Sequence, residues 1–285
     1  MKEWRDMSEQ MTSSIREGEK FTETEVENIL ANFTIDGYCH LGQVMDKEEI
    51  AALRDALERK IVDPAMQEDQ PGDHRRGNSL MRMYEYDHAF RDLIVREPFA
   101  SLAEAILGED CHLMSQNALI TPPNAPAEPD GPGGWHVDDL VHFPLPSGVQ
   151  SHDPAMPPPC LVMQIFVPLT DIEMIEHGPT QVVPGSHLAG RIPDGQDHPT
   201  FGNHGRVSIF ARAGECYMFN NQMWHRGAPN PSDRLRLLGG VTYSKRFVAQ
   251  KLYPFIDYCM PKHVWDGAGP RLQRFLGRHT KGAYG

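Results

Sequence analysis

The chain has 285 residues, of which 40% are hydrophobic and 23% charged, a balance typical of folded globular proteins rather than of disordered or collagen-like ones. Its 27 Lys and Arg residues against 39 Asp and Glu residues give a formal charge of −12, which excludes the basic surface that a phosphate backbone requires. The start, MKEWRDMSEQ, has no apolar signal-peptide core and no stretch approaches the ~20 apolar residues that span a bilayer, so we expect a cytoplasmic protein without nucleic-acid or membrane partners.

The N-terminal part of the chain is predicted to be mainly helical. Apolar residues recur at spacings of three and four in three segments, Thr22–Phe33, Lys47–Ile61 and Phe99–Leu107. The first segment starts with a capping-box pair, Thr22 and Glu25, which indicates where a helix begins. A short strand over Gly37–Leu41 is expected to follow it.

From residue 111 the apolar pattern becomes that of short strands separated by Pro- and Gly-rich clusters. The runs are CHLMSQNALIT (111–121), LVMQIFVPL (161–169), VSIFAR (207–212), GECYMFN (214–220) and LRLLGGVTYS (235–244). Helices followed by strands predict an α+β fold that is mainly β, with an antiparallel core and a helical flank, and the spacing of the runs favours a sandwich or jelly roll. We expect a single domain over 1–285, with 1–110 as the flank, 111–250 as the core and 251–285 as a C-terminal extension.

Two Pro- and Gly-rich segments, Pro122–Gly134 and Phe143–Pro159, bracket the sequence WHVDDLVH. Loops of this length without secondary structure are usually functional or disordered in a compact domain. Their position favours covers over a site.

His136 and Asp138 form the only His-x-Asp sequence in the chain. On an extended strand, residues i and i+2 point to the same face, so an imidazole and a carboxylate would project together into the core. With a distant histidine they would form the facial triad of non-haem Fe(II), which leaves coordination positions open. His225 follows the predicted strand GECYMFN and is the candidate for that ligand, and the alternative is a capped loop histidine.

Arg234 and Arg236 lie on the next predicted strand and share a face. An arginine beside such a metal would bind a carboxylate through two hydrogen bonds, as a keto-acid cosubstrate that chelates the iron requires. Surface arginines on strands are common, and we expect that role for one of the two.

Three motifs in this order and spacing, WHVDD (135–139), IEHGPTQVVPGSH (175–187) and WHRGAPNPSDRLR (224–236), resemble the phytanoyl-CoA dioxygenase family of Fe(II)- and 2-oxoglutarate-dependent oxygenases. The resemblance covers roughly residues 30 to 250. It implies a double-stranded β-helix, a cupin-like jelly roll, in which His136, Asp138 and His225 bind Fe(II) and 2-oxoglutarate and O2 are cosubstrates. The family's 2-oxoglutarate-binding arginine lies eleven residues beyond the distal histidine, which selects Arg236 over Arg234, and Thr180 matches a threonine that contacts the cosubstrate.

The chain departs from the family pattern at two positions. Many members have a lysine where Thr121 stands, and a hydroxyl is common where this chain has Gly227. Asn117, on the same strand face as Thr121, is the expected replacement donor. His187, in the PGSH turn, is expected to be structural. Asp138 disfavours halogenation, because related halogenases have a small residue in place of this carboxylate.

The expected function is oxidation of a small-molecule metabolite, by hydroxylation or another oxidation, with release of succinate and CO2. Two alternatives stay open: a jelly-roll binding module without redox chemistry, and a cupin-like metal-dependent hydrolase or isomerase that ignores 2-oxoglutarate. The Arg- and aromatic-rich segment His74–Tyr86 faces either the substrate or solvent, and the tail from Tyr253 covers either the barrel mouth or a homo-oligomer interface.

Overall fold

The predicted N-terminal helices are present. A computed structural model of the chain describes residues 20–63, 75, 76, 78–128, 130–193, 195, 197–252 and 257–280. Helix α2 (Glu23–Asp36) starts at the predicted capping box, in which Thr22 Oγ1 accepts from the Glu25 N–H at 3.4 Å and Glu25 Oε2 accepts from the Thr22 N–H at 2.8 Å. It ends at Gly37, whose φ of +79° is left-handed.

Helices α3 (Lys47–Ile61) and α5 (Phe99–Leu107) have the predicted bounds, and strand β1 (Tyr38–Gln43) follows α2. Four short elements were not predicted, because two to six residues are too few to show a period: β2 (Arg75–Arg76), β3 (Ser79–Met81), the 3-10 turn η2 (Met83–Glu85) and α4 (His88–Leu93). None of the helices in the described ranges combines the length and apolar character that crossing a membrane requires.

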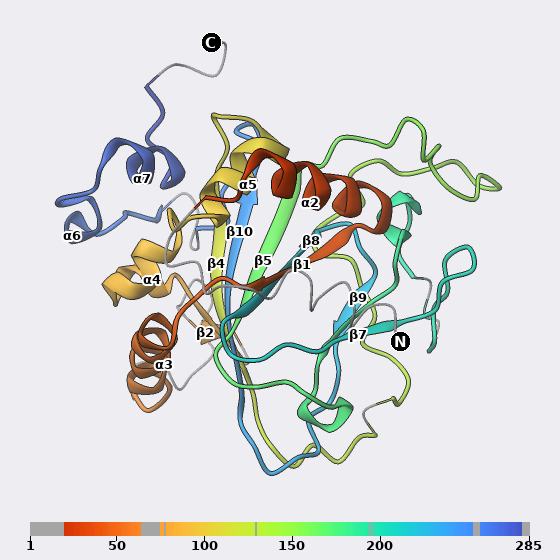
Figure 1. Cartoon of the computed structure of the whole chain (residues 1–285), viewed down its shortest axis with the longest axis horizontal. Coiled ribbons are helices and arrows are strands. Elements are labelled where there is room, and N and C mark those ends of the chain that lie inside the picture. The colour runs from red at the N-terminus through yellow and green to blue at the C-terminus, as the bar shows by residue number, and fades with distance from the viewer. Residues whose placement is uncertain are drawn as a thin grey trace.

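Two antiparallel sheets form the centre of the molecule (Figure 1). The larger has seven strands in the order β1-β8-β5-β10-β4-β3-β2, and its long members are β4 (His112–Thr121), β5 (Val162–Pro168), β8 (Glu215–Asn220) and β10 (Arg236–Ser244). The smaller has the order β7-β6-β9, with β6 (Thr180–Val182), β7 (Val207–Ile209) and β9 (His225–Gly227). The prediction of a mainly β chain with helices beside the sheet is thus confirmed.

The larger sheet is covered on both faces. In β5, Met163, Ile165 and Val167 pack into a core shared with the helices. The alternate residue Phe166 packs with Val182 and Ile209 of the smaller sheet. Every residue of β5 is therefore buried, which explains why its sequence is apolar apart from Gln164 rather than alternating. We call the face toward the smaller sheet the inner face.

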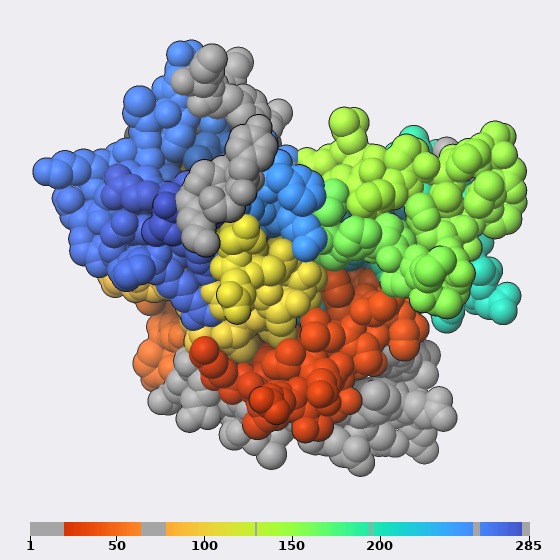
Figure 2. Space-filling view, turned by 90° about the horizontal axis from the view of Figure 1, so that it is seen from above, coloured from red at the N-terminus to blue at the C-terminus, as the bar shows by residue number. Residues whose placement is uncertain are grey.

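The described part of the C-terminal extension lies on the helical side of the larger sheet. Helix α7 (Pro270–Phe275) places Phe275 edge-on against Tyr243 of β10, with ring centroids 5.3 Å apart, and Arg271 pairs with Glu104 of α5 at 2.6 Å. This extension (blue) and the segment around residues 140–160 (light green) lie on opposite sides of the molecule (Figure 2). Residues 253–256 and 281–285 of the predicted extension lie outside the described residues.

The PGSH turn fixes the end of α2. The 3-10 turn η4 (Ser186–Leu188) brings His187 Nε2 within 3.1 Å of the Thr34 carbonyl oxygen, to which it donates. The Gly185 N–H donates to the Asp36 carbonyl at 2.9 Å. Burial lowers the pKa of His187 from its ordinary 6.5 to about 4, so the ring is neutral in the folded state. His187 therefore has the structural position that the sequence predicts.

Phe275 should anchor the C-terminal extension. Phe275→Ala is expected to lower the free energy of unfolding by about 3–5 kcal/mol, because it removes a fully buried ring. The matched change Phe247→Ala alters a ring that is 75% exposed and should stay within about 0.5 kcal/mol of wild type. Urea unfolding of both variants measures the difference, and equal effects would contradict this packing.

The low pKa of His187 should make stability depend on pH. The unfolded chain takes up a proton below its ordinary pKa of 6.5, whereas the folded chain does so only near 4, so acid lowers the free energy of unfolding over this window. His187→Gln removes that term. Urea unfolding should show that the variant is less stable than wild type at about pH 7.5. The difference in the free energy of unfolding between the two proteins should be about 2 kcal/mol smaller at about pH 5. A difference independent of pH would exclude this role.

Candidate metal centre

His136 and His225 face each other across the two segments that carry them. Their backbones form an isolated antiparallel bridge in which each N–H donates to the other's carbonyl at 3.0 Å. The two rings consequently lie on the same face, with centroids 4.3 Å apart. The segment after His136 leaves the sheet at once, so the predicted extended strand is reduced to this single bridge.

Asp138 completes a three-residue cluster. Its Oδ1 lies 3.7 Å from His136 Nε2 and its Oδ2 lies 3.6 Å from His225 Nε2. One ligand atom from each residue lies within 4.8 Å of the others, and no other such His, Cys, Asp or Glu group occurs in the described part of the chain. These separations suit three ligands around one metal ion, each about 2.0–2.2 Å from it. The structure therefore brings the three predicted residues together.

Hydrogen bonds set how these side chains are presented. Nδ1 of His136 donates to the Gly134 carbonyl at 2.8 Å, and Nδ1 of His225 donates to the Met223 carbonyl at 2.9 Å. Each ring therefore turns the lone pair of Nε2 toward the cluster, as a metal ligand must. Burial lowers the pKa of His225 and so favours the neutral ring, while the negative charge of Asp138 acts in the opposite direction.

Gln164 of β5 supports the carboxylate. Its Nε2 donates to Asp138 Oδ2, which holds one oxygen of the carboxylate in place. Sequence reasoning missed this residue, although a single glutamine inside the apolar run LVMQIFVPL was a signal for a buried polar contact. The cluster is open on one side, because the His136 side chain is 49% exposed and that of Asp138 33%.

A second polar group lies on the inner face. Arg236, at the start of β10, is buried, its guanidinium donates to the Gly178 carbonyl, and its Nε has no hydrogen-bond partner. Thr180 Oγ1 and Tyr217 OH lie 2.8 Å apart, and Thr180 is paired across the smaller sheet with Gly227. A Cβ at Gly227 would lie 3.5 Å from Arg236 Nη2, so glycine leaves room beside the guanidinium.

The inner face connects this group to the histidines. The ring of Phe219 lies 4.9 Å from that of His225 and 5.4 Å from that of Phe166, which in turn lies 5.7 Å from Tyr217. Tyr217 was missed in the sequence, although it shares a strand face with Phe219 in GECYMFN. Burial lowers the pKa of Arg236, and Tyr217 opposes this shift.

Asn117 lies on β4 opposite Gly240 of β10, while Thr121 lies opposite Arg236. Asn117 and Thr121 are four residues apart, which is about 13 Å along the strand. Asn117 therefore lies at the level of Phe166, which is also paired with Gly240, and not at that of Arg236. Its Oδ1 is buried without a hydrogen-bond partner.

Part of the segment His74–Tyr86 does not face an open cavity. Arg82 is buried and ion-paired with Glu85 at 2.8 Å, and Tyr84 is fully buried in the core beside the helices. Neither a substrate-facing nor a solvated position fits these two residues. The side chains of His74, Arg75 and Arg76 lie outside the described residues.

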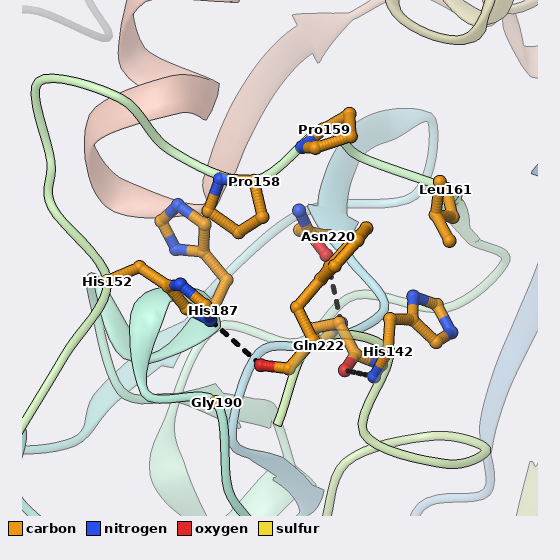
Figure 3. A pocket seen from close by; sticks show the side chains of 10 residues that line it. His142, His152, Pro158, Pro159, Leu161, His187, Gly190, Asn220 and Gln222 are labelled. Carbon is orange, nitrogen blue, oxygen red and sulfur yellow. Dashed lines mark hydrogen bonds between the residues drawn. The ribbon is translucent and has the colours of Figure 1, made fainter. Parts of the chain in front are cut away.

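The two Pro- and Gly-rich segments are tied to the body of the protein. The Ala125 N–H donates to the Asn230 carbonyl at 2.9 Å, and the His152 N–H donates to that of Leu188 at 2.8 Å. Figure 3 shows a small pocket beneath the second segment, where His152 Nε2 lies 2.8 Å from the Phe143 carbonyl. Gln222, which lines this pocket, accepts from the His142 N–H and donates to the Leu140 carbonyl, and so fixes the turn after Asp138.

Two curated proteins are similar to this chain in sequence. The chain is 25% identical over 253 residues to an uncharacterized protein of Mycobacterium tuberculosis, covering 86% of this chain and 84% of the relative. It is 24% identical to dioxygenase hkm4 of Aspergillus hancockii, covering 61% and 52%.

Two solved structures share the fold. The epimerase SnoN from nogalamycin biosynthesis, in complex with Fe3+, alpha ketoglutarate and nogalamycin RO, is 22% identical with a TM-score of 0.60 over 84% of this chain and 91% of that one. HygX from Streptomyces hygroscopicus, with nickel and 2-oxoglutarate bound, is 18% identical with a TM-score of 0.58 over 81% and 89%. The family model for phytanoyl-CoA dioxygenase matches residues 33–238, which include the three clustered residues and Arg236, and the chain therefore belongs to this family.

Proposed function

We propose that this chain is an Fe(II)- and 2-oxoglutarate-dependent oxygenase that hydroxylates, or otherwise oxidises, a small-molecule metabolite. In this proposal the two sheets are the family's double-stranded β-helix. The observation that carries it is a buried arginine with an unpartnered Nε on the inner face of the larger sheet, together with a His-Asp-His cluster that includes His225 of the facing smaller sheet. A buried cation of this kind is costly without an anion, and a cosubstrate carboxylate would supply one.

His136, Asp138 and His225 would hold the iron. Two imidazoles and one carboxylate are the donor set of the facial triad, and both Nδ1 atoms are already committed to carbonyls. Bound iron, with 2-oxoglutarate and O2, would supply the oxidising chemistry, in which the cosubstrate becomes succinate and CO2. The protein's part is to fix the ligands and exclude water from the inner face.

Arg236 would bind the distal carboxylate of 2-oxoglutarate. Thr180 and Tyr217 have one proton each, and only one is used in the bond between them, so the pair has one hydroxyl donor left for that carboxylate. Asn117, which is displaced along the strand from Arg236, is proposed to contact 2-oxoglutarate away from that carboxylate, because rotating its amide would offer Nδ2 as a donor in place of the unpartnered Oδ1.

The alternatives fit these contacts less well. A binding module without redox chemistry, or a hydrolase on the same fold, would give the buried Arg236 no anion to bind. The outcome of the oxidation is a separate question, since the structurally similar proteins include an epimerase and a carbocyclase. A nucleic-acid substrate is disfavoured by the charge of −12.

The three ligands should be required for metal binding. Asp138→Ala and His225→Ala should each weaken Co(II) binding, followed anaerobically by its visible absorption, by more than about 100-fold, because loss of outer-shell partners alone costs 10–100-fold. His88→Ala, at a side chain that is 82% exposed, is the control and should bind as wild type does. Tight binding by either ligand variant would exclude this site.

Arg236 should be required for 2-oxoglutarate. Adding the keto acid to the anaerobic Fe(II) protein should give a weak visible charge-transfer band. Arg236→Gln should raise the apparent Kd of 2-oxoglutarate by about 10–100-fold while metal binding persists, because a charge-assisted hydrogen bond contributes about 1.5–3 kcal/mol.

The exposed neighbour Arg234 provides the matched control, since Arg234→Gln should leave the titration unchanged. Arg236→Lys keeps the buried charge and tests whether a failed titration reflects misfolding. If wild-type protein bound iron but gave no band, the oxygenase proposal would be wrong and the hydrolase or isomerase would take its place.

A further inference from the structure

We propose that Arg226, next to the metal ligand His225, is a positioning residue that sets the orientation of the opposite ligand, His136. The proposal rests on the metal site of the proposed function. It extends that site to a residue that touches neither the metal nor the cosubstrate.

Arg226 points away from the metal cluster. Along β9, His225 and Gly227 face the larger sheet, so Arg226 between them lies on the opposite face of the smaller sheet. Its residue surface is only 2% exposed. Its guanidinium lies over the ring of Trp135, 5.0 Å from the ring centre. Arg226 therefore lies against the segment that leads into His136.

The guanidinium holds the backbone of that segment. Nη1 donates to the carbonyls of Gly131 at 2.6 Å and Gly133 at 2.7 Å. Nε donates to Gln181 Oε1 at 2.7 Å, and Gln181 is paired with Arg226 across the smaller sheet. Gln181 is itself fixed, because its Nε2 donates to Ser208 Oγ at 3.0 Å. The Arg226 guanidinium thus joins the glycine-rich segment to the sheet that carries His225.

Arg226 binds the Gly133 carbonyl, and the next residue, Gly134, accepts the hydrogen bond from the His136 ring. Gly133 and Gly134 have φ values of +83° and +78°, a pair of left-handed residues that side chains would strain. The Gly134 carbonyl then accepts the Nδ1 proton of His136 at 2.8 Å. Fixing the Gly133 carbonyl fixes the peptide plane that precedes Gly134. The direction of His136 Nε2 therefore depends on the hydrogen bonds that Arg226 donates to this segment.

A separate ion pair on the same segment makes it possible to distinguish orientation of His136 from simple attachment of the segment. Arg206 Nη2 pairs with Asp130 Oδ2 at 3.0 Å, so the same segment is attached near Gly131 by an independent and more exposed contact. Arg206 reaches the side chain of Asp130, whereas Arg226 reaches the glycine carbonyls. If anchoring alone mattered, losing either arginine would have a similar effect on the metal.

The test compares Arg226→Gln and Arg226→Lys with the matched control Arg206→Gln. Anaerobic Co(II) titration gives the affinity, the Co(II) absorption spectrum reports ligand geometry, and thermal unfolding of the metal-free protein reports stability. Arg226→Gln should weaken Co(II) binding by about 10–100-fold and change the spectrum, as loss of outer-shell partners does. Arg226→Lys should recover part of the affinity, and Arg206→Gln should bind as wild type does.

Normal Co(II) affinity and spectrum in Arg226→Gln would overturn the proposal, even if the variant unfolded at a lower temperature, because the role would then be structural. An equal loss in Arg206→Gln would also overturn it. Wild-type protein that bound Co(II) but not 2-oxoglutarate would refute the oxygenase and leave this comparison decisive for Arg226. Wild-type protein that bound no metal would overturn both.

Discussion

The backbone bridge between His136 and His225 is the constraint on which the metal centre depends. Two hydrogen bonds of 3.0 Å join segments that are far apart in sequence, and they make the two rings direct neighbours on one face. A shift of one residue in this pairing would turn one ring to the opposite face, because side chains alternate along extended backbone. The bridge sets where the two rings lie, and the Gly134 carbonyl on one side and the Met223 carbonyl on the other set how each ring is turned.

The larger sheet meets two demands at once. One face packs against helices through apolar side chains, and the inner face meets the smaller sheet. Placing Gln164, Tyr217 and Arg236 on that inner face is costly unless each finds partners. Gln164 binds Asp138 and Tyr217 binds Thr180, whereas the Nε of Arg236 has none. The unpartnered Nε of Arg236 thus contrasts with the hydrogen-bonded side chains of Gln164 and Tyr217 on this face, and a bound anion would stabilise it.

Much of this could be read from the sequence, and the failures have physical causes. The helices and long strands have clear periods, and the ligands of the cluster stand in short motifs with fixed spacing. Strands β6 and β9 have three residues each, too few for any pattern, so only β7 of the smaller sheet, which lies in the run VSIFAR, could be predicted. The Arg- and aromatic-rich composition of the segment His74–Tyr86 suggested an accessible position for Arg82 and Tyr84, but both are buried. An ion pair with Glu85 allows Arg82 to be buried. Gln164 and Arg226 act through contacts across the sheets, and sequence separation hides such contacts.

The division between core and loops bears on specificity. The clustered side chains and Arg236 are fixed by sheet pairing and by buried hydrogen bonds, so under the proposed function a change of substrate would come from the segments around the open side of the cluster. Two of these are joined by the ion pair between Asp139, directly after a ligand, and Lys251, which follows β10. Leu140 and Phe247, on the same two segments, are strongly exposed. The similar structures named as an epimerase and a carbocyclase share the fold, and under the proposed function the core would supply the reactive centre while the surrounding loops select the substrate.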